Sequence, residues 1–358
     1  MIHNGLPVQV DASKDALPSI KEDLYPKKYT LCKEGDIAFA DASEDTNDVG
    51  KAIEFNNCAG KSIVCGLHTI HGRDRLGLTS IGFKGYLFSS KVYHDQIKSI
   101  AQGTKVFSIK ASNFDEVILG LPKIEEQKKI SSLLMAIDDR ILTQSKIIEE
   151  LTALRSALHQ GIMSKGLEDG SWRIQTLADV LSERTELNID GHAVHSVSVS
   201  KGIVNQIEYL GRSFAAKDTS RYHVAYPGDV IYTKSPTGEF PYGIVKQSQI
   251  SIKAALSPLY GVYVPISPEI GYIIHNHFLS AKNALNYLHQ LIQKGAKNTI
   301  NITNQRFLQN SMPLPTNKIA ALLYYNAIKT VSDKIILEEM VMEKFQSQKS
   351  FLLKTMFI

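Results

Sequence analysis

The chain has 358 residues, which suggests two or three globular units, and its hydrophobic fraction of 43% excludes an intrinsically disordered protein. The formal charge of +4 permits a polyanionic partner without making the whole chain a strongly basic protein. The cysteines at 32, 58 and 65 form no paired framework, and no stretch is apolar enough to span a membrane. With no signal-peptide pattern at residues 1–10, we expect a cytoplasmic protein without a membrane partner.

Four segments follow one another along the chain. Residues 1–122 are predicted to be a mixed segment, with a short β-rich run at 36–39 among turn-forming residues. Residues 123–167 are predicted to form one long helix that ends at Gly166. Residues 168–313 form a second mixed segment, with a strand at 229–233 and helical structure around 273–291. Residues 314–358 are predicted to form a second long helix.

Apolar residues spaced mostly three and four apart predict both long helices. The first seam contains Ile130, Leu134, Ile137, Ile141, Ile148 and Leu151, and the second contains Ile328, Val331, Ile335, Met342 and Phe345. Two narrow apolar seams favour an antiparallel coiled coil, in which Gln144 and Glu338 would form a polar layer. The alternative, in which each helix packs separately on its own domain, stays open.

The two halves of the chain repeat each other. At a shift of 193 residues, Gly-Asp at 35–36 aligns with Gly-Asp at 228–229, and Leu-Pro at 121–122 with Leu-Pro at 314–315. The period is too long for a solenoid, so we expect two copies of one module. The predicted fold class is α+β, with two mixed α/β domains, each followed by a long helix, in a pseudo-two-fold internal repeat.

Several motifs carry a resemblance to a known family. The run Leu-Pro-Lys-Ile-Glu-Glu-Gln-Lys-Lys-Ile at 121–130, followed by Ile-Asp-Asp-Arg-Ile at 137–141, resembles the conserved helix of specificity (S) subunits of type I restriction-modification systems. The approach from Gln-Gly-Thr at 102–104 through Phe114 is typical of the same family. Trp172, Leu177 and Asp179-Val180 resemble the start of its target-recognition domains. The resemblance extends over essentially the whole chain.

The resemblance implies a DNA-reading scaffold. Target-recognition domains at 1–122 and 168–313 would each read half of a split site in double-stranded DNA. The conserved helices at 123–167 and 314–358 would pair, hold the domains apart and dock two modification subunits. Restriction (motor-nuclease) subunits would join this complex.

The resemblance also implies that the chain itself is not an enzyme. S-adenosylmethionine, ATP and magnesium would belong to the partner subunits, so no cofactor is expected in this chain. A methyltransferase of this kind needs a catalytic loop of Asn-Pro-Pro or Asp-Pro-Pro followed by an aromatic residue, and neither Asn-Pro nor Pro-Pro occurs in the sequence. One departure concerns the first domain: only 34 residues precede Gly35, and no Trp-Leu-Asp-Val opening is found there. We therefore expect the first target-recognition domain to be N-terminally short or to have diverged.

Two rival functions remain open. One is a coiled-coil adaptor with two protein-binding domains. The other is an S-like subunit of a modification-only or type II system. Specific DNA binding separates the adaptor from the other two functions, and the genomic neighbour separates a complete type I system from a modification-only system.

Candidate DNA contacts lie mainly in polar and basic loops. The loop after the second Gly-Asp strand offers Lys234, Ser235, Thr237 and Tyr242. Arg73 and Arg75 reach guanine edges or form ion pairs, and Lys105, Lys294, Lys297 and Asn298 hold phosphates or are only solvated. The loop at 40–49, which matches the 234–242 loop by the repeat, is acidic and is expected to be solvated.

Two further patterns predict no site. Gly-Lys-Ser at 60–62 lacks the glycine that a phosphate-binding loop requires five residues earlier. Cys58, Cys65, His68 and His71 are residue types that bind zinc, but their spacing matches no common zinc module. We therefore expect neither nucleotide binding nor a metal site.

Overall fold

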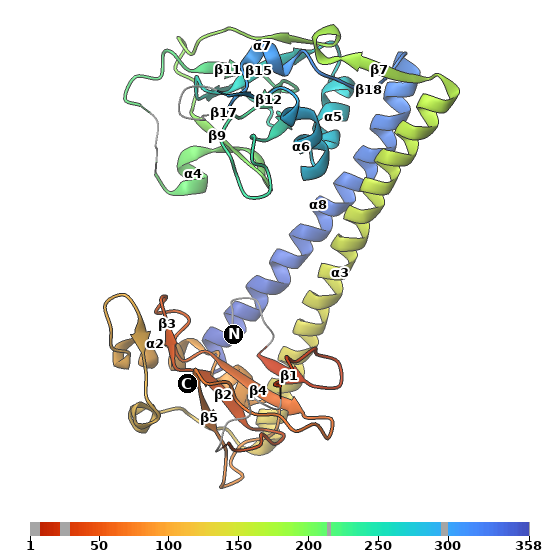
Figure 1. Cartoon of the computed structure of the whole chain (residues 1–358). Coiled ribbons are helices and arrows are strands. Elements are labelled where there is room, and N and C mark those ends of the chain that lie inside the picture. Colours follow the sequence, from red (N-terminus) through yellow and green to blue (C-terminus); the bar gives the residue numbers. More distant parts are fainter. Residues whose placement is uncertain (1–7, 22–28, 213–215, 295–299, 358) are drawn as a thin grey trace. The chain divides into compact units, whose positions relative to one another are not determined.

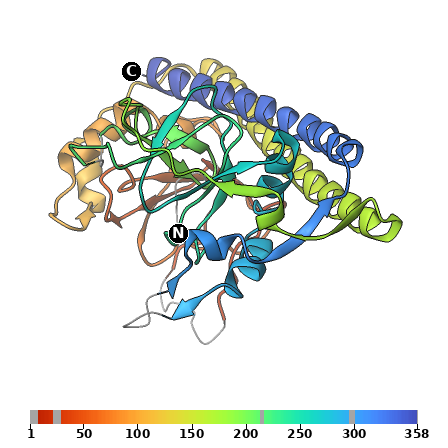
Figure 2. The same cartoon turned by 90° about the horizontal axis from the view of Figure 1, so that it is seen from above.

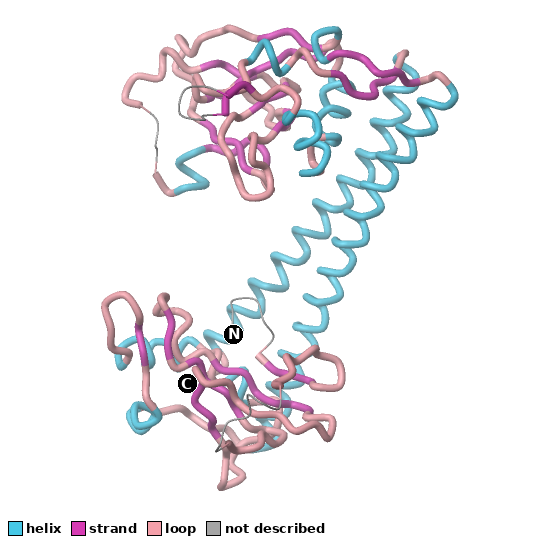
Figure 3. Tube along the Cα trace, in the orientation of Figure 1, coloured by secondary structure: helices cyan, strands magenta, loops and turns pink. Residues whose placement is uncertain are grey.

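The computed structural model describes residues 8–21, 29–212, 216–294 and 300–357 (Figure 1). The chain forms two compact units, of which unit 1 comprises Met1–Glu149 and Leu337–Ile358 and unit 2 comprises Glu150–Ile336. Each unit combines one mixed α/β segment with part of both long helices, α3 (Ile124–Asp169) and α8 (Lys318–Thr355) (Figure 3). The predicted mixed content with two long helices is confirmed.

Unit 1 is built on a four-stranded sheet with the order β1 (Gln9–Asp11), β4 (Ala52–Asn57), β2 (Ile37–Ala40) and β5 (Thr69–Gly72). β1 runs parallel to β4, whereas β2 is antiparallel to both of its neighbours. The shorter elements are β3 (Ala42–Ser43) paired with β6 (Phe107–Ser108), α1 (Lys84–Leu87), α2 (Lys91–Ile100) and a 3₁₀ turn at Ala111–Glu116.

Apolar clusters in unit 1 pack on the sheet, and a further cluster packs against the helices. Tyr93 and Ile97, one turn apart on α2, are buried with Phe39 of β2. The cluster against the helices joins α1 to both long helices and contains Phe83, Tyr86, Leu87, Ile130, Leu134 and Phe357. Within unit 1, the α/β segment therefore packs directly on α3 and α8.

Unit 2 is built on an antiparallel sheet with the order β13 (Val245–Gln247), β12 (Val230–Tyr232), β15 (Gly261–Pro265) and β8 (Leu181–Glu183). Four strand pairs accompany it: β7 (Trp172–Thr176) with β18 (Ser311–Pro315), β9 (His195–Ser198) with β10 (Gly202–Asn205), β11 (His223–Ala225) with β14 (Ala254–Leu256), and β16 (Gln293–Lys294) with β17 (Ile300–Asn301). The short helices are a 3₁₀ turn at Leu177–Asp179, α4 (Gln206–Leu210), α5 (Pro268–His277), α6 (Ala281–His289) and α7 (Asn304–Phe307).

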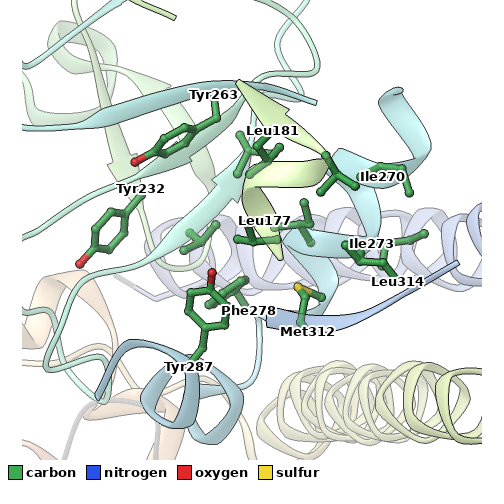
Figure 4. Packing of buried hydrophobic residues seen from close by; sticks show 14 of the residues in the cluster. Leu177, Leu181, Tyr232, Tyr263, Ile270, Ile273, Phe278, Tyr287, Met312 and Leu314 are labelled. Carbon is green, nitrogen blue, oxygen red and sulfur yellow. The ribbon is translucent and has the colours of Figure 1, made fainter. Parts of the chain in front are cut away.

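Aromatic side chains dominate the core of unit 2. Tyr232 and Tyr263 both stack on Phe307, with ring centroids 4.7 and 5.0 Å apart. Leu177 and Leu181 fill the space between this aromatic group and α5 (Figure 4). Residues from both ends of the second mixed segment thus meet in one core.

The predicted strands at 36–39 and 229–233 are confirmed as β2 and β12. The helical stretch at 273–291 is two helices, because Ser280 caps the start of α6 and separates it from α5. The second long helix begins at Lys318, because residues 311–315 pair with β7 instead.

The prediction that the first long helix ends at Gly166 is wrong. Gly166 lies inside α3, and a side chain there would overlap the Trp172 ring. The helix ends at Asp169, followed by Gly170 with a positive φ of 78°. Gly166 therefore provides a close approach for a tryptophan rather than a helix end.

The long helices lie side by side within each unit (Figures 1 and 2). In unit 1, Arg140 lies over the Phe345 ring and the Gln144 side chain donates to the carbonyl and the carboxylate of Glu338. The predicted contact between Gln144 and Glu338 is confirmed. In unit 2, His159 bonds to Tyr324. In these contacts the residue number rises along α3 while that of its partner on α8 falls, so the paired segments run antiparallel.

All the predicted seam residues are buried or half-buried in these units. Ile130 and Leu134 pack on the α/β segment of unit 1 as well as near the end of α8, so part of the seam serves domain packing. Among the described residues, no helix is both long and apolar enough to cross a membrane.

Candidate nucleic-acid interface

The loop between β12 and β13 in unit 2 is held at its base and exposed at its tip. Thr237 and Phe240 exchange two backbone hydrogen bonds of 3.0 and 2.9 Å, and Phe240 is buried. Gly243 has a φ of 96° and lies against the carbonyl of Thr233, where no side chain fits. The sequence therefore builds a fixed loop whose residues 235–239 face solvent.

This loop contains the candidate residues of the second domain. Ser235 and Thr237 are exposed, and Lys234 is half-buried. Burial lowers the pKa of Lys234, with an opposing effect from Glu183. Tyr242 is half-buried beside His289, and its carbonyl accepts a hydrogen bond from the Tyr232 hydroxyl. Lys234, Ser235 and Thr237 can thus present a cation and two hydroxyls to a polyanion, while Tyr242 supports the loop.

The corresponding acidic loop of unit 1 is braced by its own carboxylates. Asp45 accepts from the backbone and side-chain amides of Asn47, at 2.8 Å each. Asp48 forms an ion pair with Lys51. These local bonds explain Asp45 and Asp48 as part of the loop structure.

Arg73 is engaged by a buried carboxylate. Its Nε and Nη2 donate to the two oxygens of Asp36 at 2.8 and 2.6 Å, and Nη2 also donates to the carbonyl of Leu31. Burial raises the pKa of Asp36, but hydrogen bonds from Arg73, Lys33 and His71 outweigh it and hold that pKa at about 2. Of the two alternatives for Arg73, the structure shows the ion pair.

Arg75 lies two residues further on and is exposed. It belongs to a loop that Asp74 organises by accepting backbone N–H groups from Leu76, Gly77 and Thr79. Arg75 therefore sits on a fixed loop with its side chain toward solvent.

Unit 2 contains a second aspartate–arginine pair that sequence reasoning missed. Arg184 donates to both oxygens of Asp229 at 2.7 and 3.0 Å and lies over the Tyr226 ring. The repeated Gly-Asp pair is visible in the sequence. The arginine is not, because Arg73 follows its aspartate whereas Arg184 precedes it by 45 residues.

The structure describes only some of the candidate residues that lie next to the repeated glycines. Lys105 is exposed beside Gly103, in a turn closed by backbone bonds between Gln102 and Ser108. Lys294 belongs to β16, opposite Ile300 of β17. Lys297 and Asn298 lie outside the described residues.

Comparisons with known proteins agree with this architecture. A family model described as "Type I restriction modification DNA specificity domain" matches residues 78–153. The EcoKI specificity subunit of Escherichia coli (strain K12) is 24% identical over 175 residues, which cover 43% of this chain and 37% of that protein. The chain thus spans little more than a third of the length of this curated relative.

Two solved structures share the fold. The S subunit of the type I restriction-modification system from M. genitalium is 13% identical, with a TM-score of 0.57 over 98% of this chain and 88% of that chain. A chain from a structural study of complex assembly and conformational transition in the type I R-M system is 14% identical, with a TM-score of 0.52 over 96% and 89%. The resemblance predicted from the residues is confirmed: residues 78–153 match the DNA specificity domain of type I restriction-modification systems, and the fold of the chain is similar to that of a type I S subunit.

Proposed function

We propose that this chain is the DNA-recognition subunit of a type I restriction-modification complex. Each mixed α/β segment reads one half of a bipartite site, and the chain catalyses no reaction itself. The observation that carries this proposal is the fixed loop after β12 in unit 2, in which Lys234 lies beside the exposed Ser235 and Thr237. Polar side chains on such loops specify bases, and lysines position the DNA backbone.

The internal repeat is supported by the sheets. β2 lies between the antiparallel strands β4 and β5, and β12 lies between the antiparallel strands β13 and β15. The aspartate before each central strand is held by an arginine. Two copies of one module would give the pseudo-two-fold arrangement that a split DNA site requires.

The long helices are proposed to form an antiparallel coiled coil that sets the separation of the two reading domains. The contact between Gln144 and Glu338 supports this proposal, because a polar pair in an apolar seam fixes register. The buried seam residues Leu134 and Ile335 support it as well.

Partner subunits are proposed to dock on the helices. Large apolar side chains of α8 are exposed in unit 1, among them Leu337, Met340 and Val341. Exposed apolar groups of this kind mark interaction sites. Two modification subunits would bind there and supply the sites for S-adenosylmethionine, while restriction subunits would supply those for ATP and magnesium in the cytoplasm.

Sequencing the methylome of cells that express this chain with its modification subunit tests the proposal. We expect a methylated motif with two short specific halves and an unspecific spacer, absent when this chain is omitted. A protein-binding adaptor would leave the methylation pattern unchanged. An S-like subunit of a modification-only system would give the motif without restriction of unmethylated DNA.

A further inference from the structure

Two thiols and one imidazole meet in unit 1, beside the pair formed by Asp36 and Arg73. Sγ of Cys32, Sγ of Cys65 and a ring nitrogen of His71 all lie within 4.8 Å of one another. The two sulfur atoms are 3.6 Å apart. Cys32 is buried, and Cys65 and His71 are half-buried. The three residues come from separate segments, so their meeting is a product of the fold.

We propose that Cys32, Cys65 and His71 bind a zinc ion. A tetrahedral zinc site has Zn–S bonds of about 2.3 Å, which places two sulfur ligands about 3.8 Å apart. The observed 3.6 Å is close to that separation, whereas a disulfide would require a sulfur–sulfur distance of about 2.05 Å. Two thiolates and one imidazole also form a zinc-selective donor set. A solvent molecule would complete the four positions.

The surroundings of His71 resemble the outer shell of a metal site. Nε2 of His71 lies 2.8 Å from a carboxylate oxygen of Asp36. A carboxylate that bonds to a ligating imidazole fixes its ring and strengthens its donor nitrogen. Asp36 is itself held by Arg73, so this carboxylate has one fixed orientation. The chain of contacts from Arg73 through Asp36 to His71 would hold the imidazole in place before the metal arrives.

The position of the site in the sheet suggests what the metal would do. Cys32 belongs to a segment bonded to Ile63 and Val64, Cys65 precedes β5, and His71 lies within β5. Among the described residues, β5 is an edge strand, whereas its counterpart β15 in unit 2 is covered by β8. A zinc ion would tie the edge of this smaller sheet to the segment before β2, and binding energy of this kind stabilises small domains. The role is structural and lies beyond DNA recognition.

The residue spacing led us to expect no metal site, because it grouped His68 with Cys58, Cys65 and His71. In the structure the His68 side chain is 91% exposed and lies beside Asp41. Cys32 supplies the missing ligand, and it is 33 residues before Cys65, too far for any short motif. Only the fold reveals the donor set.

The test is the metal content of the full chain, purified under reducing conditions without a metal-affinity tag. We expect about one zinc ion per chain by elemental mass spectrometry. Reconstitution of the metal-free chain with cobalt should give thiolate-to-cobalt charge-transfer bands in the near ultraviolet. The Cys65→Ser variant should lose these bands, while the matched His68→Gln control should keep both the zinc and the bands.

Two outcomes would overturn the proposal, and neither depends on the folding of a variant. One is a wild-type chain that binds neither zinc nor cobalt under reducing conditions. The other is a metal-free chain in which peptide mass spectrometry, without reductant, finds Cys32 joined to Cys65. That result would make the pair a redox-active thiol couple instead of a metal site.

Discussion

Arg73 and Arg75 are separated by one residue, yet the structure gives them different tasks. Arg73 holds the buried carboxylate of Asp36, whereas Arg75 is exposed. Replacing Arg73 by Gln leaves a buried carboxylate without its charged partner, so we expect a lower free energy of unfolding. Urea denaturation of the full chain measures this loss.

Arg75→Gln is the matched control for that experiment. Its unfolding free energy should stay within about 0.5 kcal/mol of the wild type, because surface substitutions rarely do more. Its affinity for specific DNA should fall. If Arg73→Gln were as stable as Arg75→Gln and bound DNA more weakly, Arg73 would be a DNA-contacting residue and our assignment would be wrong.

We expect the stability of unit 2 to depend on pH through the buried His159 and the half-buried His277. His159 bonds to Tyr324 at 2.6 Å and lies 3.3 Å from a ring nitrogen of His277. Burial lowers the pKa of both histidines to about 4. Their unfolded value is about 6.5, so the unfolded chain binds more protons between these two pH values. The stabilisation is complete above about pH 6.5 and is lost as the pH falls toward 4.

We therefore expect the melting temperature to drop between pH 7 and pH 5, with His275 acting in the same direction. His277→Gln should make this drop smaller, because it removes one of the titrating groups. The exposed His68→Gln variant serves as the control and should melt with the wild-type pH dependence. Equal pH dependence in all three proteins would show that these buried histidines are not responsible.

At the scale of single elements, the polar layer between α3 and α8 is predicted to provide register at some cost in stability. Replacing both Gln144 and Glu338 by Leu should raise the melting temperature, because an apolar pair packs better in the seam. Cross-linking between cysteines introduced on the two helices should then report several registers instead of one. Glu339→Leu, at an exposed neighbouring position, is the control. A large loss of stability in the double variant would mean that the pair does something else.

The exposed apolar side chains of α8 give a second prediction about this element. Changing Leu337 and Met340 to Glu should abolish co-purification with the modification subunit, since charged groups cannot be buried in an apolar interface. DNA binding by the chain alone should be unchanged. Glu343→Gln on the same helix is the matched control. Undiminished co-purification of the double variant would place the docking surface elsewhere.

The long helices could be predicted from the sequence because their apolar spacing is regular over many residues. The central strands could be predicted because short β-rich runs lie between turn-forming residues. The contact between Gln144 and Glu338 could be predicted because both interrupt a regular seam. The end of α3 could not, since a glycine that ends a helix and one that admits a tryptophan ring look alike in sequence. The partners of Asp36 and Asp229 and the cluster around Cys32 also escaped prediction, because they join residues through tertiary structure alone.

In the whole molecule, the two helices are proposed to be the spacer between two reading domains. The boundary between the two units crosses α3 at Glu149–Glu150 and α8 at Ile336–Leu337. Residue pairs near these positions face one another across the helices, as Gln144 and Glu338 do. Lengthening both helices here by the same amount should keep the pairing and change only the distance between the domains.

The most direct test inserts four residues at both positions and sequences the methylome of cells with the modification subunit. Four helical residues add about 6 Å at about 1.5 Å per residue. Base pairs are spaced by about 3.4 Å, so the expected motif has unchanged halves and a spacer longer by one or two base pairs. The same insertion in the exposed turn at Lys201 should leave the spacer unchanged. A motif with altered halves and the original spacer would contradict the account and would make the helices part of the reading surface.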